Sequence, residues 1–118
     1  MSEPTAELTI DIDIIRNNIT YLKSLLKPNT KFMAILKANA YGHGLALLAA
    51  QLKNVDGVGV ATYAAAVVLR EHGFKAPIVM MQGFSSTDEL QQCLNYQLTP
   101  VLHNHYQLDR LRQLTPNQ

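Results

Sequence analysis

Four short apolar runs, starting near residues 32, 57, 77 and 98, recur about every 20–25 residues along the chain. Helix-like stretches fill the intervals between them. Strands and helices that alternate at this spacing are typical of consecutive βα units, which build a sheet of parallel strands with helices packed on it. The sequence therefore predicts an α/β fold, and a length of 118 residues corresponds to a single domain.

The chain carries clear start and stop signals for these elements. A short alternating piece, 8–12, comes first. The predicted strands are 31–37, 57–61, 78–81 and 98–102, and the predicted helices are 13–26, 43–53, 62–72, 86–96 and one that begins at 104 and ends before Pro116. Ser86 and Glu89 form the pattern of a capping box, whereas Thr62 is followed three residues later by Ala65, so that its box is incomplete.

Composition excludes several classes of protein. A formal net charge of +1 gives no electrostatic reason to bind nucleic acid or an anionic membrane. The single cysteine, Cys93, cannot form an internal disulfide, which suits the cytoplasm. Residues 1–7 are polar and acidic rather than a signal peptide, and no apolar run approaches the ~20 residues that span a bilayer. We expect a cytoplasmic, globular protein.

The first predicted strand ends on a lysine that could take part in a reaction. The segment Lys31-Phe-Met-Ala-Ile-Leu-Lys37 is apolar on both faces, which predicts a strand buried on both sides. Lys37 shares the face of Met33 and Ile35, because side chains alternate along a strand. Partial desolvation at a strand end favours the neutral amine, which can form a Schiff base with a carbonyl.

The loop after this lysine suits a phosphate group. Gly42 and Gly44 allow close backbone approach, Tyr41 offers a hydroxyl, and the N–H groups at the following helix start can hold an anion. In parallel α/β folds, sites gather at the carboxyl ends of the strands, where Lys37 would lie. An ordinary strand-end lysine followed by a glycine turn is the structural alternative.

The eight residues Lys37-Ala-Asn-Ala-Tyr-Gly-His-Gly44 resemble, residue for residue, the pyridoxal-phosphate attachment motif of the alanine racemases. Residues 10–18, 69–73 and 77–84 are also similar to segments of that family. The resemblance covers nearly all of the chain, but only the first part of a longer family chain. It implies the first half of a TIM (β/α)8 barrel as a single domain, 1–118, with the β-rich carboxyl-terminal domain absent.

The resemblance also implies an activity. Family members interconvert L-alanine and D-alanine through a pyridoxal 5'-phosphate aldimine, which supplies D-alanine for peptidoglycan. Lys37 would be the residue that carries the cofactor and one of two acid/base groups, and Tyr41 would contact the cofactor phosphate. The second base is a tyrosine from the other subunit of a homodimer, and an arginine later in the chain faces the pyridine nitrogen. Neither has a counterpart here, so residues 1–118 alone are expected to be inactive.

Other candidate residues carry less. By resemblance, Met81 falls where the family has an apolar side chain near the cofactor, and His43 is a structural residue of the loop. The histidines His72, His103 and His105 have no carboxylate or cysteine cluster at ligand spacing, so we expect no metal site.

Two other functions and one assembly hypothesis stay open. The chain could be a different Schiff-base barrel, such as a pyridoxal-phosphate homeostasis protein, or a non-enzymatic small α/β binding domain. Half a barrel would leave open edges at 31–37 and 98–102, and an apolar face carrying Met33, Ile35 and Met81. We expect that face to pair with a second copy or with the missing carboxyl-terminal part, unless helix 13–26 folds over it.

Overall fold

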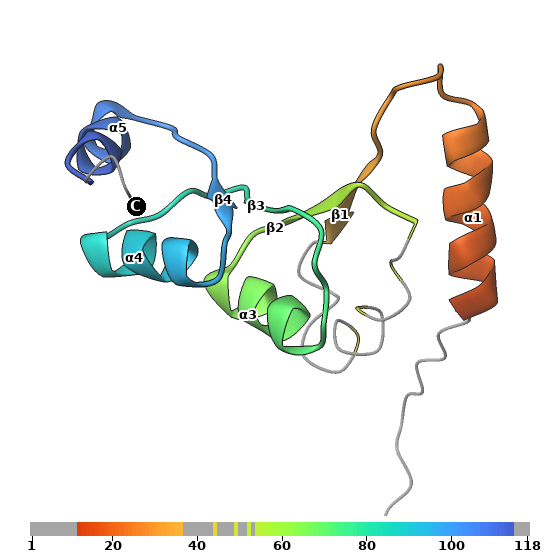
Figure 1. The fold of residues 1–118 in the computed structure, drawn as a ribbon, viewed down its shortest axis with the longest axis horizontal. Helices are drawn as coiled ribbons and strands as arrows, with labels where there is room; N and C mark the ends of the chain where they lie inside the picture. The colour runs from red at the N-terminus through yellow and green to blue at the C-terminus, as the bar shows by residue number, and fades with distance from the viewer. Residues whose placement is uncertain (1–11, 37–43, 45–48, 50–51, 53, 115–118) are drawn as a thin grey trace, which may run out of the picture.

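A computed structural model describes residues 12–36, 44, 49, 52 and 54–114 (Figure 1). Its centre is a parallel sheet of four strands in the order β1-β2-β3-β4. The strands are β1 (Met33–Leu36), β2 (Gly57–Val60), β3 (Ile78–Met80) and β4 (Thr99–Pro100). The strand order follows the sequence order, as in the first half of a (β/α)8 barrel, and the predicted fold class is confirmed.

Helices precede the sheet and follow three of its strands. They are α1 (Ile12–Ser24), α3 (Tyr63–Glu71), α4 (Thr87–Asn95) and α5 (His105–Arg112). Most of the predicted helix 43–53 lies outside the described residues. Within this range, Gly44 and Ala49 are described as helical. The predicted piece 8–12 lies outside the described residues as well, apart from Ile12, which begins α1. No helix in the described part of the chain is long and apolar enough to cross a membrane.

The fourth strand is shorter than the predicted 98–102. Val101 donates its backbone N–H to the carbonyl of Met80 at 3.0 Å, but Pro100 has no N–H to donate. Because neighbouring residues of a parallel strand direct their backbone groups to opposite sides, the nitrogen of Pro100 faces away from β3. The proline therefore lies at the outer edge of the sheet, where strands tolerate this residue.

The described helices α3, α4 and α5 each begin at a side-chain cap. Thr62 accepts a hydrogen bond from the N–H of Ala65, and Asn104 accepts one from that of Gln107. The predicted capping box at Ser86 is only half correct. Ser86 Oγ accepts from Glu89 N at 3.1 Å, but the Glu89 carboxylate reaches Ser85 instead, accepting from its N–H at 2.6 Å and its hydroxyl at 2.7 Å.

The core lies on the side of the sheet that α3 and α4 cover (Figure 1). Val58, Val60 and Ile78 are fully buried there against Ala66 and Leu69 of α3. Burying one such aliphatic side chain stabilises a fold by roughly 1.5–3 kcal/mol. Ile19 of α1 joins the same cluster, so α1 does not fold over the opposite face of the sheet.

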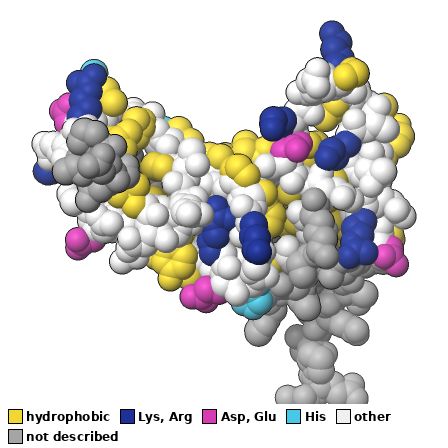
Figure 2. All heavy atoms as spheres, viewed as in Figure 1, with side chains coloured by type: hydrophobic (Ala, Val, Ile, Leu, Met, Phe, Trp, Pro, Cys, Tyr) yellow, Lys and Arg dark blue, Asp and Glu magenta, His cyan; other side chains and the backbone are white. Residues whose placement is uncertain are grey.

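The opposite face of the sheet is open near β1. Met33 and Ile35 remain 47% and 43% exposed, so the prediction of a strand buried on both sides is wrong. The reason is the pairing register, which places Gly57 beside Met33 and Gly59 beside Ile35. Glycine contributes no side chain to cover its neighbours. Figure 2 shows hydrophobic side chains in the hollow between the α1 and α5 ends of the molecule.

Arg70 ties the elements together at the amino-terminal edge of the sheet. Its guanidinium donates to the carbonyls of Phe74 and Ala76, both at 2.8 Å, just before β3. It also donates to the carbonyls of Tyr96 at 2.9 Å and Gln97 at 3.0 Å, just before β4. Partial burial lowers the pKa of this arginine, but an arginine remains charged at any physiological pH.

Candidate functional site

The carboxyl-terminal edge of the sheet is the first place to look for a site, as in other parallel α/β folds. β1 ends there at Leu36, and the next residue in the sequence is Lys37. Lys37 and Tyr41 themselves lie outside the described residues, so their predicted roles stay predictions. The strand that precedes them in the sequence and the ends of the neighbouring strands are described, and these form the carboxyl-terminal edge of the sheet.

An apolar wall forms beside that strand end, on the open face. A β-carbon on Gly59 would lie 2.9 Å from Ile35 Cδ1 and 3.1 Å from Met81 Sδ. Both side chains therefore close over the glycine, and any larger residue would displace one of them. The sequence predicts Ile35 and Met81 on one face, but the close approach at Gly59 was not predicted from it. A glycine inside a strand is itself a signal of close approach by another group.

Such a wall fits the flat, largely apolar ring of a cofactor such as pyridoxal phosphate. The thioether of Met81 is polarizable and makes favourable contacts with aromatic rings. Ile35 is still 43% exposed, so its surface is available to a ligand. The predicted contact of Met81 with the cofactor is not tested by these observations, but the surface that it needs is present.

The backbone of Met81 is held at both ends. Its N–H donates to the carbonyl of Val60 at 2.9 Å, and its carbonyl accepts from Nε2 of His103 at 2.7 Å. Gln107 hydrogen-bonds the residues next to this contact and is buried, with an exposed fraction of 4%. Its amide accepts from the backbone N–H of His103 and donates to the carbonyl of Phe84 at 2.8 Å. The sequence alone does not reveal this role of Gln107, because its partner Phe84 is brought near only by the fold.

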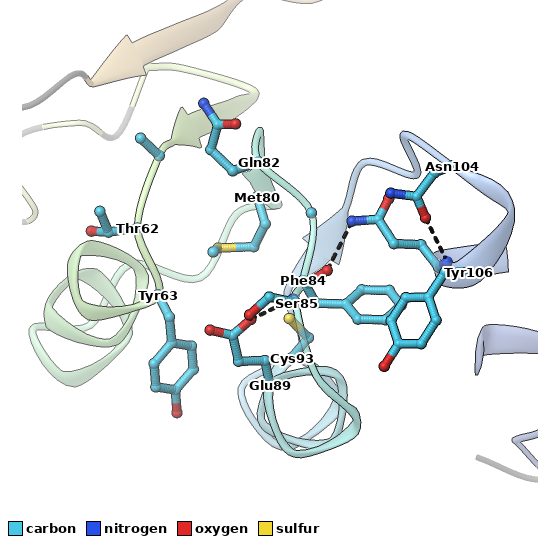
Figure 3. A pocket seen from close by; sticks show the side chains of 13 residues that line it. Thr62, Tyr63, Met80, Gln82, Phe84, Ser85, Glu89, Cys93, Asn104 and Tyr106 are labelled. Atoms are coloured by element: carbon cyan, nitrogen blue, oxygen red, sulfur yellow. Dashed lines mark hydrogen bonds between the residues drawn. The ribbon is translucent and has the colours of Figure 1, made fainter. Parts of the chain in front are cut away.

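A cavity of about 570 Å³ opens on the other side of the sheet (Figure 3). Met80 lines it, and Met81 follows directly on the strand that Met80 ends, so their side chains point to opposite faces. The cavity is therefore not the open face that carries Ile35 and Met81. It lies among the starts of α3, α4 and α5. Its other lining residues are Ala61, Thr62, Tyr63, Gln82, Gly83, Phe84, Ser85, Glu89, Cys93, Asn104, Tyr106 and Gln107.

The titratable groups of this cavity do not form a catalytic pair. Hydrogen bonds from the Ser85 hydroxyl and backbone N–H lower the pKa of Glu89, which keeps the carboxylate ionised at neutral pH. Burial, with a smaller contribution from the charge of Glu89, raises the pKa of Cys93 and keeps its thiol protonated. Burial and the neighbouring Tyr96 likewise raise the pKa of Tyr63. Among the described residues that line the cavity, these three groups are neither free bases nor activated nucleophiles.

Two of the three histidines considered as metal ligands have other partners. His72 Nδ1 lies 2.8 Å from the carbonyl of Val68, and His103 bonds the carbonyl of Met81. Within the described ranges, no group of three or more His, Cys, Asp or Glu side chains could hold a metal ion.

Residues 10–118 match the protein family described as "Alanine racemase, N-terminal domain". An alanine racemase of Nitrosomonas eutropha is 39% identical over 86% of this chain and 28% of its own. One of Haemophilus influenzae is 37% identical over 95% of this chain and 31% of its own. The chain thus spans less than a third of the length of the curated relatives it matches.

Solved structures give the same picture of the fold. The alanine racemase of Acinetobacter baumannii matches with a TM-score of 0.79 and 33% identity, covering 88% of this chain and 31% of that protein. The alanine racemase of Bacillus anthracis, whose crystal structure contains bound L-Ala-P, matches with a TM-score of 0.77 and 27% identity. That match covers 92% of this chain and 28% of the other.

Proposed function

The chain belongs to the alanine racemase family through its amino-terminal domain, and we propose that it supplies the cofactor-carrying part of a pyridoxal-phosphate-dependent alanine racemase. One observation carries the proposal. In the sequence, the eight-residue motif from Lys37 to Gly44 begins immediately after Leu36, which ends β1 at the carboxyl-terminal edge of a parallel sheet. This is the edge at which parallel α/β proteins place their reacting groups.

The two motif residues have separate tasks in this proposal. In the resting enzyme the amine of Lys37 would hold the cofactor covalently. Once the amine of alanine has displaced it, the freed amine of Lys37 would move a proton to or from Cα on one face of the substrate. The hydroxyl of Tyr41 binds the cofactor phosphate. When bound, pyridoxal phosphate acts as the electron sink that makes the Cα proton removable. A positioned acid/base group of this kind typically accelerates proton transfer by about 10²–10⁴-fold.

The described residues contribute orientation. Ile35 and Met81 form an apolar wall over Gly59 beside the end of β1. A ring resting on this wall would be shielded from water on the side that contacts Ile35 and Met81. Exclusion of water strengthens the electrostatic interactions on which a charged reaction centre depends.

The remaining parts of the proposed enzyme come from outside residues 1–118. A second acid/base group acts on the opposite face of the substrate and comes from the partner in a homodimer. The reaction would supply D-alanine to peptidoglycan synthesis in the cytoplasm. Residues 1–118 alone would accordingly show no racemase activity.

Covalent trapping tests the proposal. The full chain that carries these residues is loaded with pyridoxal phosphate, reduced with borohydride and digested, and the pyridoxyl mass is located. We expect the label on Lys37. Lys37→Ala should abolish it, whereas the control Lys53→Ala should keep it. A label on Lys23, Lys27, Lys31 or Lys53 instead would show that the lysine is wrongly assigned, and the absence of any label would refute cofactor binding.

A further inference from the structure

We propose that His103 and Gln107 are positioning residues that hold Met81 over Gly59, so that the Met81 thioether forms the wall against which the cofactor ring rests. The inference rests on the proposed function, in which pyridoxal phosphate binds at the carboxyl-terminal edge of the sheet. It adds His103 and Gln107, which lie between β4 and α5 or on α5, far from the motif in the sequence. Both would act on the cofactor indirectly, through Met81.

The contact between His103 and Met81 crosses from one βα loop to the next. His103 precedes α5, and Met81 follows directly on β3. Since a carbonyl can only accept, Nε2 of His103 carries the hydrogen in this bond of 2.7 Å. Together with the bond from Met81 N to the carbonyl of Val60, at 2.9 Å, it fixes both peptide groups of Met81. The direction of the Met81 side chain is thereby fixed toward the open face.

Gln107 makes this contact rigid. Its side-chain oxygen accepts from the backbone N–H of His103, and its side-chain nitrogen donates to the carbonyl of Phe84 at 2.8 Å. One buried amide therefore joins the residue that holds Met81 to the loop that follows Met81. Gly83, at φ +72°, makes room for it, because a β-carbon there would lie 2.6 Å from the Gln107 nitrogen.

Met81 needs such support because its side chain is unbranched. A methionine has three rotatable bonds and takes the shape of the space that its backbone position allows. Over Gly59 that space is bounded on the far side by Ile35 Cδ1. A small shift of the Met81 backbone would carry its sulfur off the glycine and away from the ring. The energies of sulfur–aromatic contacts correspond to a change of about 2- to 10-fold in cofactor affinity.

The test uses His103→Ala in the full chain, with His72→Ala as the matched control. Both histidines are exposed, and each has a ring nitrogen at hydrogen-bond distance from a backbone carbonyl, but His72 lies at the end of α3. Binding of pyridoxal phosphate is followed by its absorbance. We expect His103→Ala to raise the dissociation constant about 2- to 10-fold and His72→Ala to leave it unchanged. Gln107→Met should act in the same direction as His103→Ala.

A double-mutant cycle separates positioning from stability. In a Met81→Ala background, His103→Ala removes the same backbone hydrogen bond, so its effect on the unfolding midpoint should persist. Its effect on cofactor affinity should vanish, since there is no longer a side chain to position. An effect on affinity of equal size in both backgrounds would overturn the inference, as would unchanged affinity in His103→Ala. Failure of the unmodified chain to bind pyridoxal phosphate would instead refute the proposed function, and the inference with it.

Discussion

Gly83 shows how one residue shapes the loop beyond β3. Its φ of +72° lies in the left-handed region, and a β-carbon there would lie 2.5 Å from the carbonyl oxygen of Val101. Gly73, after α3, has a φ of +90° but nothing within 4 Å of the same position. Both glycines therefore adopt a left-handed backbone, but only at Gly83 would an added β-carbon overlap with neighbouring atoms. Substitutions at the two positions can be compared directly.

Gly83→Ala should lower the free energy of unfolding by about 2–4 kcal/mol, and Gly73→Ala by about 1–2 kcal/mol. The left-handed backbone accounts for the loss of about 1–2 kcal/mol at both sites. At Gly83 the overlap of the added methyl group with Val101 and Gln107 causes the additional loss. Denaturant titration of both variants gives the comparison. Equal losses would mean that the loop relaxes to accept the methyl group.

Prediction from sequence works at this scale only where the partner is local. The caps at Thr62 and Asn104 could be identified because each bonds an N–H three residues later. His103 and Gln107 could not be assigned their partners, since Met81 and Phe84 lie more than 20 residues away. Even the local capping box at Ser86 was half wrong, because a flexible glutamate can reach either of two adjacent N–H groups.

At the scale of elements, Arg70 joins α3 to the ends of two other segments. Five donors in a planar fork allow it to bind the carbonyls of Phe74, Ala76, Tyr96 and Gln97 together. These carbonyls lie just before β3 and β4, so the arginine fixes where both strands begin. Its role is structural, because it lies at the edge of the sheet opposite the motif.

Arg70→Lys should cost about 2–4 kcal/mol of stability although the charge is kept. A lysine ammonium is a compact donor that cannot span four carbonyls, and part-buried acceptors would lose their partners. Arg112→Lys, at an exposed position on α5, is the control and should stay within about 0.5 kcal/mol. Thermal unfolding measures both. If Arg70→Lys lost no more stability than Arg112→Lys, water would be able to replace the guanidinium at the four carbonyls without a loss of free energy.

At the scale of the whole molecule, the described part of the sheet has two edge strands and an open face near β1. β1 and β4 are these edge strands, in agreement with what the resemblance to half a barrel implied. The spacing of the apolar runs gave the parallel order, because short βα connections place consecutive strands side by side. It could not give the exposure of Met33 and Ile35, which depends on two glycines opposite them and on which side the helices pack.

We propose that the 118-residue chain associates with a second copy through this open face. Sedimentation over a range of concentrations should show a monomer that gives way to a dimer. Met33→Asp should shift the equilibrium to monomer, because an unpaired charge in an apolar contact is costly. The control Leu25→Asp changes a residue near α1 that is 64% exposed, and it should leave the monomer–dimer equilibrium unchanged.

A different result would favour another architecture. A clean monomer at high concentration, with slow amide exchange in both β1 and β4, would contradict association through the open face. It would indicate a self-sufficient small α/β domain, in which the two edges are protected without a partner.

Pro100 has a consequence for the chain while it is being made. A nascent chain exposes its sheet edges before any later segment can cover them, and open edges recruit strands from other molecules. The outward-facing nitrogen of Pro100 interrupts the row of donors that a foreign strand would need on β4. Only a segment that tolerates this gap can pair there. We therefore expect Pro100 to hinder the pairing of a foreign strand with β4 during biosynthesis.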